Sequence, residues 1–223
     1  LGGRVLCTNL RGAFSEPMAQ TVLGGILALN RGFEQAVLCQ PRREWVKPRL
    51  HASVRILWGV HVLLLGAGSV NARVRELLSQ FACTFTVFGR TSGDIHTPAE
   101  LDEALPKAGV VCAALPDTKD TRGLFDTARI ARLNPDALFV NVGRGSLVDE
   151  NALVAALEAG RLRGAVLDVT VQEPPAPASP LWTCPRLILT QHSSAASDRV
   201  GLVTVEIFAR NLARYREGKP LLN

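Results

Sequence analysis

Residues 61–71 read HVLLLGAGSVN, and this stretch decides the fold. An apolar run of strand type ends at Gly66, and a helical pattern begins within a few residues. In dinucleotide folds the first glycine of such a turn permits a tight bend, and the second lets a pyrophosphate approach the backbone. The start of the helix then offers N–H groups and a partial positive charge to the phosphates. We therefore predict a phosphate-binding turn made by Gly66, Gly68, Ser69 and Val70.

Runs of strand type alternate with helical patterns from His61 onward. Several runs are apolar throughout, which is typical of parallel strands covered on both faces. We predict strands at residues 61–65, 84–88, 109–113, 137–142, 164–167 and 187–189. We predict helices between them at residues 71–81, 98–104, 126–133 and 149–159. This alternation predicts an α/β fold, a doubly wound parallel sheet of the Rossmann type.

Two longer helical patterns flank this core. Residues 16–30 carry Pro17 in the first turn, where its missing N–H costs nothing. They are apolar almost all round, so we expect this helix to be buried, with a second subunit as one candidate partner. Residues 197–217 form an amphipathic pattern that Gly218 and Pro220 end. The Pro-rich residues 173–180 exclude a helix or a central strand.

Composition excludes several classes of function. The net charge is +5, but the basic residues are scattered and no aromatic residues interleave with them, which argues against nucleic-acid binding. No apolar run reaches the roughly 18 residues that span a bilayer, so we expect no membrane contact. Five widely spaced cysteines predict reduced thiols in a cytoplasmic protein and no metal site. The chain begins at Leu1 without a signal-peptide pattern, and we interpret this as an internal start.

The end of the second strand predicts which dinucleotide is bound. NAD sites usually place an acidic residue there, about 20 positions after the glycine turn, to accept the ribose hydroxyls. This chain instead continues as Gly89-Arg90-Thr91-Ser92, with no carboxylate at the turn. An arginine suits a phosphate dianion through two parallel N–H bonds. We therefore predict that Arg90 and Thr91 select NADP(H), with NAD(H) possible as a weaker ligand.

Four further segments carry polar groups at or beyond strand ends, where parallel sheets place their active sites. They are LPDTKDTRGLF at 115–125, NVGRGSLVD at 141–149, LDVTVQEP at 167–174 and LTQH at 189–192. Together, and in this order, they resemble the signature blocks of the D-isomer-specific 2-hydroxyacid dehydrogenases. The resemblance extends over nearly the whole chain. It implies hydride transfer between NADP(H) and a small 2-keto acid.

The resemblance assigns roles to individual residues. Within N-x-x-R-G-x-x-V-D it implies that Arg144 binds the substrate carboxylate, and it makes His192 the acid–base residue with Glu173 as its carboxylate partner. It places Asp168 near the nicotinamide and implies further cofactor contacts from Leu115, Pro116, Val142, Gly143, Arg144 and His192. In chemical terms, an arginine polarises a keto oxygen, and a histidine donates a proton to it as hydride arrives at carbon.

Two residues depart from the family pattern. Gln191 stands where the family usually has proline before the histidine. Asn71 stands where the glycine turn usually has a third glycine or alanine, and we expect it to loosen the packing of helix on strand.

The resemblance also bears on the organisation of the protein. The family's N-terminal substrate domain is largely absent from these residues, and the family's last helix returns to that domain. We therefore assign residues 1–196 to a dinucleotide-binding domain and 197–223 to a C-terminal helix that serves the other domain. The resemblance further implies a homodimer. Two alternatives stay open: an NAD-using member such as a phosphoglycerate or formate dehydrogenase, and a non-catalytic, redox-sensing dinucleotide-binding module.

Overall fold

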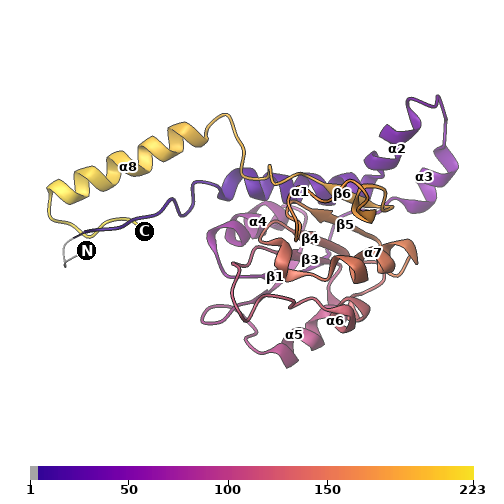
Figure 1. Ribbon diagram of the computed structural model, residues 1–223, viewed down its shortest axis with the longest axis horizontal. Coiled ribbons are helices and arrows are strands. Elements are labelled where there is room, and N and C mark those ends of the chain that lie inside the picture. The colour runs from indigo at the N-terminus through magenta and orange to yellow at the C-terminus, as the bar shows by residue number, and fades with distance from the viewer. Residues whose placement is uncertain (1–4) are drawn as a thin grey trace.

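A computed structural model describes residues 5–223 and has a six-stranded parallel sheet at its centre (Figure 1). The strand order is β2-β1-β3-β4-β5-β6, and every neighbouring pair is parallel. The strands are β1 (His61–Leu65), β2 (Thr84–Phe88), β3 (Val110–Ala113), β4 (Leu138–Asn141), β5 (Gly164–Leu167) and β6 (Leu187–Leu189). The order reverses between β1 and β3, and ligands of open α/β sheets bind at such a switch point.

Helices cover both faces of the sheet, which confirms the doubly wound prediction. Successive residues of β1 alternate between two buried clusters: Leu63 and Leu65 face one, whereas Val62 and Leu64 face the other. The first cluster is covered by α5 (Pro98–Ala104), α6 (Thr127–Arg132) and α7 (Glu150–Glu158). The second is covered by α1 (Ser15–Arg31) and α4 (Ser69–Ser79). Short 3-10 turns lie at Leu105–Lys107, Gly145–Leu147 and Pro180–Trp182.

Side-chain caps fix where the connecting helices begin. Thr97 and Glu100 form a reciprocal capping box at the start of α5. Asp126 and Asp149 each accept a hydrogen bond from a backbone N–H in the first turn of α6 and α7. Each cap lies just after a strand or loop, so it orients its helix against the sheet.

The helix α1 is buried against its own chain. Its residues Val22, Ile26 and Leu29 are at most 1% exposed and pack into the cluster beneath β4 and β5. Glu16 at its start pairs with Arg73 of α4, with the Nε and Oε2 atoms 2.5 Å apart. A second subunit is therefore not needed to explain the apolar character of this helix.

Two short helices that the sequence did not predict follow α1. They are α2 (Phe33–Cys39) and α3 (Lys47–Ser53), and they project from the body of the sheet (Figure 1). Several apolar side chains in this region are exposed: Val37 and Leu38 are 59% and 65% exposed, and Trp45 between the helices is 90% exposed.

The last helix, α8 (Val200–Arg216), stands apart from the sheet and runs beside the segment that precedes α1 (Figure 1). Asn223 at the C-terminus donates to the carbonyl of Arg11 in that segment. The apolar side that the sequence predicted is largely exposed, with Phe208 and Tyr215 both more than 60% accessible. Within residues 5–223, no helix has the length and apolar character to cross a membrane.

Candidate functional site

The glycine turn lies where β1 ends and α4 begins, at the switch point of the sheet. Gly66 has a φ of 109°, a conformation that side chains with a Cβ rarely adopt, and its N–H donates to the carbonyl of Phe88 at 2.8 Å. The helix α4 begins at Ser69, with Gly68 as its N-cap residue. N–H groups in the first turn of a helix lack acceptors within that helix, so this end can bind an anion.

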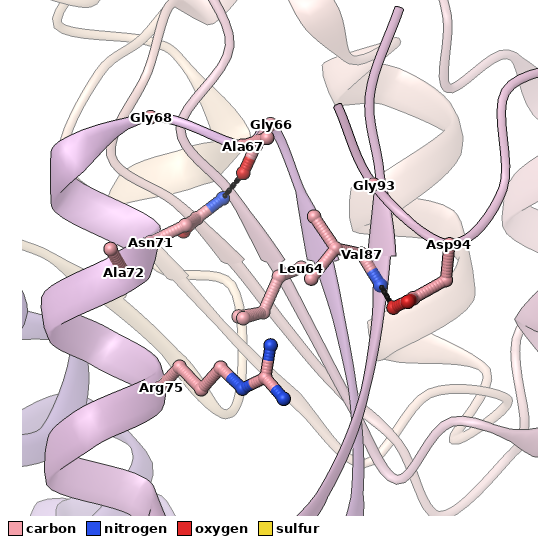
Figure 2. A pocket seen from close by; sticks show the side chains of 10 residues that line it. All are labelled: Leu64, Gly66, Ala67, Gly68, Asn71, Ala72, Arg75, Val87, Gly93 and Asp94. Atoms are coloured by element: carbon pink, nitrogen blue, oxygen red, sulfur yellow. Dashed lines mark hydrogen bonds between the residues drawn. The ribbon is translucent and has the colours of Figure 1, made fainter. Parts of the chain in front are cut away.

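Asn71 does not loosen the turn as the sequence predicted. It is 2% exposed, and its Nδ2 donates to the carbonyls of Leu65 and Gly66 at 2.9 and 2.8 Å. Figure 2 shows the bond to Gly66. The side chain therefore fills the space between helix and strand with satisfied hydrogen bonds. The expectation was wrong because an amide in this position bonds to the backbone it approaches.

A pocket of about 390 Å³ opens beside the turn, between α4 and the end of β2 (Figure 2). The backbone of the glycine turn lines it together with Leu64, Val87, Arg75 and Asp94. Arg75 lies over the ring of Phe85, 5.4 Å from its centroid. Arg90 and Thr91 are exposed on the loop beyond β2 and are not among the residues that line this pocket.

A carboxylate does lie near the end of β2, contrary to the sequence analysis. Asp94 comes six residues after the strand, and the loop folds back so that its Oδ2 accepts the N–H of Val87 at 2.8 Å. The backbone N–H of Asp94 in turn donates to the carbonyl of Val87. The sequence missed Asp94 because its distance along the chain placed it outside the expected turn. The pocket thus holds a cation and an anion, Arg75 and Asp94.

The loop after β4 carries Arg144. Asn141 is fully buried, and its side chain accepts the N–H of Gly143 and donates to the carbonyl of Arg144. The backbone on both sides of Arg144 is therefore fixed while its side chain stays exposed. A Cβ on Gly145 would overlap the carbonyl group of Thr170, so this loop packs directly on the loop after β5.

The segment 115–125 is tied to the Arg144 loop by ion pairs and backbone bonds. Asp117 accepts Nε and Nη2 of Arg122 at 2.7 and 2.8 Å and the hydroxyl of Ser146 at 2.9 Å. These hydrogen bonds from Arg122 and Ser146 lower the pKa of Asp117 below its usual value. The N–H of Gly123 donates to the carbonyl of Ser146. Leu115 and Pro116 are thereby held beside Gly143, whose Cα approaches the backbone of Leu115.

Glu173 and His192 are in direct contact, as the sequence predicted. Nδ1 of His192 lies 2.6 Å from Oε2 of Glu173, and the other carboxylate oxygen accepts the N–H of Thr170 at 3.2 Å. Burial alone would raise the pKa of Glu173, but the bonds from His192 and Thr170 outweigh it and lower the pKa below its usual value. Glu173 is therefore a carboxylate at neutral pH.

The backbone at His192 explains why proline is absent before it. Gln191 and His192 both adopt the left-handed conformation, with φ values of 56° and 54°. Proline is fixed near a φ of about −65° and cannot take this conformation. The turn that presents His192 therefore requires a residue other than proline at 191.

Asp168 organises the turn that carries His192, a role that the sequence analysis missed. The side chain is 3% exposed, and Oδ1 accepts the hydroxyl of Thr190 at 2.6 Å and the N–H groups of Ser193 and Ser194, each at 3.0 Å. The hydroxyl of Ser194 donates to Oδ2. The N–H of His192 donates to the backbone carbonyl of Asp168 at 2.6 Å. The expected contact of Asp168 with the nicotinamide stays a prediction.

A second pocket, of about 250 Å³, lies next to the acid–base pair. His192 and Glu173 line it together with the apolar side chains of Pro174, Trp182 and Leu189. The indole of Trp182 donates to the carbonyl of Ala176 at 3.0 Å, which fixes the ring at the mouth of the pocket. A polar pair with apolar walls is typical of a site for a small organic ligand.

The strand order brings the predicted site residues to one edge of the sheet. The glycine turn, Arg144, Glu173 and His192 follow β1, β4, β5 and β6, and the carboxyl ends of parallel strands share an edge. Val142 and Gly143 follow β4 directly and are buried there. Glu173 touches His192, whereas Arg144 is connected to that pair through the contact of Gly145 with Thr170. The arrangement can bind an anion at α4 and exchange a proton at His192.

Comparison with known sequences identifies relatives of this chain. Residues 23–194 match the family described as D-isomer specific 2-hydroxyacid dehydrogenase, NAD binding domain. Glyoxylate/hydroxypyruvate reductase B of Klebsiella pneumoniae is 44% identical over 211 residues, which cover 87% of this chain and 62% of the relative. Glyoxylate/hydroxypyruvate reductase A of Photorhabdus laumondii is 28% identical over 208 residues, covering 91% and 64%. The chain thus spans slightly less than two thirds of the length of these two curated relatives.

Solved structures agree with this assignment. A D-isomer specific 2-hydroxyacid dehydrogenase from Xanthobacter autotrophicus, in complex with NADPH and MES, aligns with a TM-score of 0.82 and 30% identity, covering 99% of this chain and 92% of that one. An NADPH-dependent glyoxylate/hydroxypyruvate reductase from Sinorhizobium meliloti, in complex with NADP and sulfate, aligns with a TM-score of 0.79 and 27% identity, covering 94% and 67%. The family match extends over most of the chain and includes the glycine turn, Arg144, Glu173 and His192. The chain therefore belongs to the D-isomer specific 2-hydroxyacid dehydrogenase family, and residues 23–194 form its nicotinamide-dinucleotide-binding domain.

Proposed function

We propose that the protein transfers a hydride between NADP(H) and a small 2-keto or 2-hydroxy acid of the D configuration. The observation that carries the proposal is the 2.6 Å contact between Nδ1 of His192 and the carboxylate of Glu173 at the ligand-binding edge of the sheet. A buried structural histidine needs no such exposed acidic partner, whereas an acid–base catalyst does.

The proposed reduction assigns one role to each polar group. The guanidinium of Arg144 binds the substrate carboxylate through paired N–H bonds and polarises the 2-keto oxygen. Nε2 of His192 donates a proton to that oxygen while the nicotinamide supplies a hydride to C2. The imidazole becomes neutral in this step, and Glu173 stabilises the protonated form that begins it. In the oxidation direction His192 accepts the same proton.

The preference for NADP(H) is supported by Arg90 and Thr91 after β2, whose side chains suit a phosphate dianion. The relatives from Xanthobacter autotrophicus and Sinorhizobium meliloti bind NADPH and NADP. Asp94 in the pocket beside the glycine turn favours the alternative, because a carboxylate there would repel a 2′-phosphate and accept ribose hydroxyls. The two cofactors must therefore be compared directly.

The test is the oxidation of NADPH and NADH by the full-length protein with glyoxylate or hydroxypyruvate as acceptor. We expect NADPH to be consumed faster than NADH at equal concentrations, and the product of hydroxypyruvate to be the D isomer by chiral chromatography. Binding of NADPH without turnover of any 2-keto acid would instead identify a dinucleotide-binding module without catalytic activity.

We also propose that the protein is a homodimer with a two-fold contact. The support comes from the surface formed by α2, α3 and the residues between them, which we call the arm (residues 33–53). The arm exposes Phe33, Val37, Leu38 and Trp45, and Ile56 and Trp58 are exposed just beyond it. An apolar surface of this kind, close to a nucleotide-binding core, is typical of contacts between identical subunits.

A further inference from the structure

The side chain of Asn71 connects three backbone and side-chain groups from two strands. Its Nδ2 donates to the carbonyls of Leu65 and Gly66, at the end of β1. Its Oδ1 accepts the thiol of Cys112 in β3 at 3.7 Å. All three partners and Asn71 itself are buried. The amide can lie only one way round, because two of its neighbours are acceptors and the third is a donor.

The thiol keeps its role as donor at any ordinary pH. Cys112 is fully buried, and burial raises its pKa to about 12. The Cys112 thiol therefore stays protonated near neutral pH and remains a donor to Asn71.

The bond from Asn71 to Gly66 fixes the direction of a backbone N–H. The peptide bond between Gly66 and Ala67 is planar and trans, so its carbonyl and its N–H point in opposite directions. Because Asn71 holds the carbonyl on the side of α4, the N–H of Ala67 points to the other side of the turn. Ala67 is exposed, and within residues 5–223 this N–H has no backbone or side-chain acceptor. It is available to a ligand.

Asn71 also shares an acceptor with the sheet. The carbonyl of Leu65 accepts the N–H of Ala114, after β3, at 3.1 Å and accepts Asn71 as a second donor. The turn is thereby tied to β3 as well as to α4. A glycine at position 71 would make none of the hydrogen bonds that the side chain of Asn71 makes to Leu65, Gly66 and Cys112.

We propose that Asn71 is a positioning residue that holds the glycine turn in its phosphate-binding shape before the cofactor arrives. This inference rests on the proposed binding of a nicotinamide dinucleotide. It reverses the expectation from the family pattern, in which a third glycine is the residue that favours binding. In this chain, restoring the glycine weakens binding because the carbonyl of Gly66 is then free to rotate.

The first experiment measures NADPH binding to the full-length protein by titration calorimetry. We expect Asn71→Gly to bind NADPH roughly tenfold more weakly, the order of magnitude that two neutral hydrogen bonds supply. The matched control is Val74→Ala on the same helix, where a buried apolar side chain is shortened without touching the turn. We expect the control to lower the melting temperature and to leave the affinity for NADPH unchanged.

The second experiment measures the affinity of Asn71→Asp for NADPH as a function of pH. A merely structural role would not predict a pH-dependent affinity. A neutral aspartic acid has one O–H donor for the carbonyls of Leu65 and Gly66, whereas the carboxylate repels them. We therefore expect the affinity of Asn71→Asp for NADPH, divided by that of the parent, to fall as the pH rises. This second experiment is sufficient by itself if Asn71→Gly does not fold.

The outcomes separate the two proposals. If the parent binds NADPH and Asn71→Gly binds it equally well or better, the role of Asn71 is refuted and the proposed function stands. If Asn71→Asp binds NADPH as tightly as the parent at every pH, the role is also refuted. If the parent binds neither NADPH nor NADH, the proposed function fails and the inference fails with it.

Discussion

Nδ1 of His192 lies 2.6 Å from Oε2 of Glu173, although the two residues belong to loops that follow different strands. The contact pairs an ionised carboxylate with the imidazole, because the hydrogen bonds from His192 and Thr170 lower the pKa of Glu173 despite its partial burial. A lowered carboxyl pKa means that the pair is intact above the usual range of a glutamate and is lost as the pH falls through that lowered value. The carboxylate of Glu173 is therefore ionised at neutral pH, where reduction would be measured.

Replacing Glu173 tests the pair through the pH–rate profile. Glu173→Gln keeps a hydrogen-bond acceptor near His192 but removes the charge that favours the protonated imidazole. We expect the rate of keto-acid reduction to fall about tenfold at neutral and alkaline pH and to recover in part as the pH falls. If the basic limb of the variant's profile coincides with that of the parent, Glu173 does not assist His192.

Removal of the imidazole has a larger predicted effect. His192→Ala should lower the rate of reduction about 100-fold or more, because general acid catalysis typically contributes that much. The affinity for NADPH, measured without substrate, should fall by a much smaller factor than the rate, because His192 is only one of several expected cofactor contacts. A variant that keeps a tenth or more of the rate would show that another group donates the proton.

The choice between NADPH and NADH is tested by Arg90. Arg90→Ala should weaken NADPH binding by about 1.5–3 kcal/mol, the range for a charge-assisted contact, and leave NADH binding nearly unchanged. Titration calorimetry of both cofactors against parent and variant measures the difference. Equal affinities of the parent for the two cofactors would contradict the proposed preference.

Asp94 provides the complementary variant. Asp94→Asn keeps an oxygen that accepts the N–H of Val87 but removes the negative charge from the pocket. We expect tighter binding of NADPH and weaker binding of NADH, because the charge repels a phosphate and attracts ribose hydroxyls. If neither affinity changes, the adenosine end of the cofactor does not approach Asp94.

Asp168 should be essential for the stability of the His192 turn. Asp168→Ala removes the acceptor of the donors from Thr190, Ser193 and Ser194 and leaves the buried N–H and hydroxyl of Ser194 unpaired. We expect a loss of about 3 kcal/mol or more, which corresponds to a fall in melting temperature of roughly 6–12 °C for a domain of this size. Asp198→Ala, at an exposed position, serves as the control and should leave the melting temperature unchanged.

The proposed dimer is tested by a matched pair of substitutions. Val37→Asp places a charge on the arm, and Val205→Asp places one on α8; the two valines are 59% and 64% exposed. Sedimentation should give a dimer for the parent and for Val205→Asp, and a monomer for Val37→Asp. A monomeric parent at micromolar concentration would refute the dimer, and dissociation by Val205→Asp alone would place the contact on α8.

The strands could be predicted closely because their sequence signal is local. The bounds of β1, β2, β5 and β6 coincide with the predicted runs, since turn residues border each run. The helices α2 and α3 could not be predicted because each has only seven residues and exposes most of its apolar side chains. Hydrophobic periodicity indicates a helix only when one face is buried over several turns.

Site residues that lie within a short motif could be predicted from the sequence. Contacts between residues that are distant along the chain could not. The glycine turn follows from a motif within the sequence, whereas the contact of Glu173 with His192 was implied only by the family resemblance. The network around Asp168 depends on hydroxyl and N–H groups more than 20 residues away, which only the pairing of β5 with β6 brings close. Asp94 depends on a loop that reverses direction, and no local pattern specifies that reversal.

The close packing of Gly145 on Thr170 sets a limit for protein engineering. Any residue with a Cβ at position 145 would push apart the two loops that carry Arg144 and Glu173. Libraries intended to change the accepted acid should therefore randomise the apolar walls around Trp182 while keeping Arg144 and Gly145 invariant. Such a screen varies only positions where the backbone tolerates other side chains, and it preserves the spacing between the loops that carry Arg144 and Glu173.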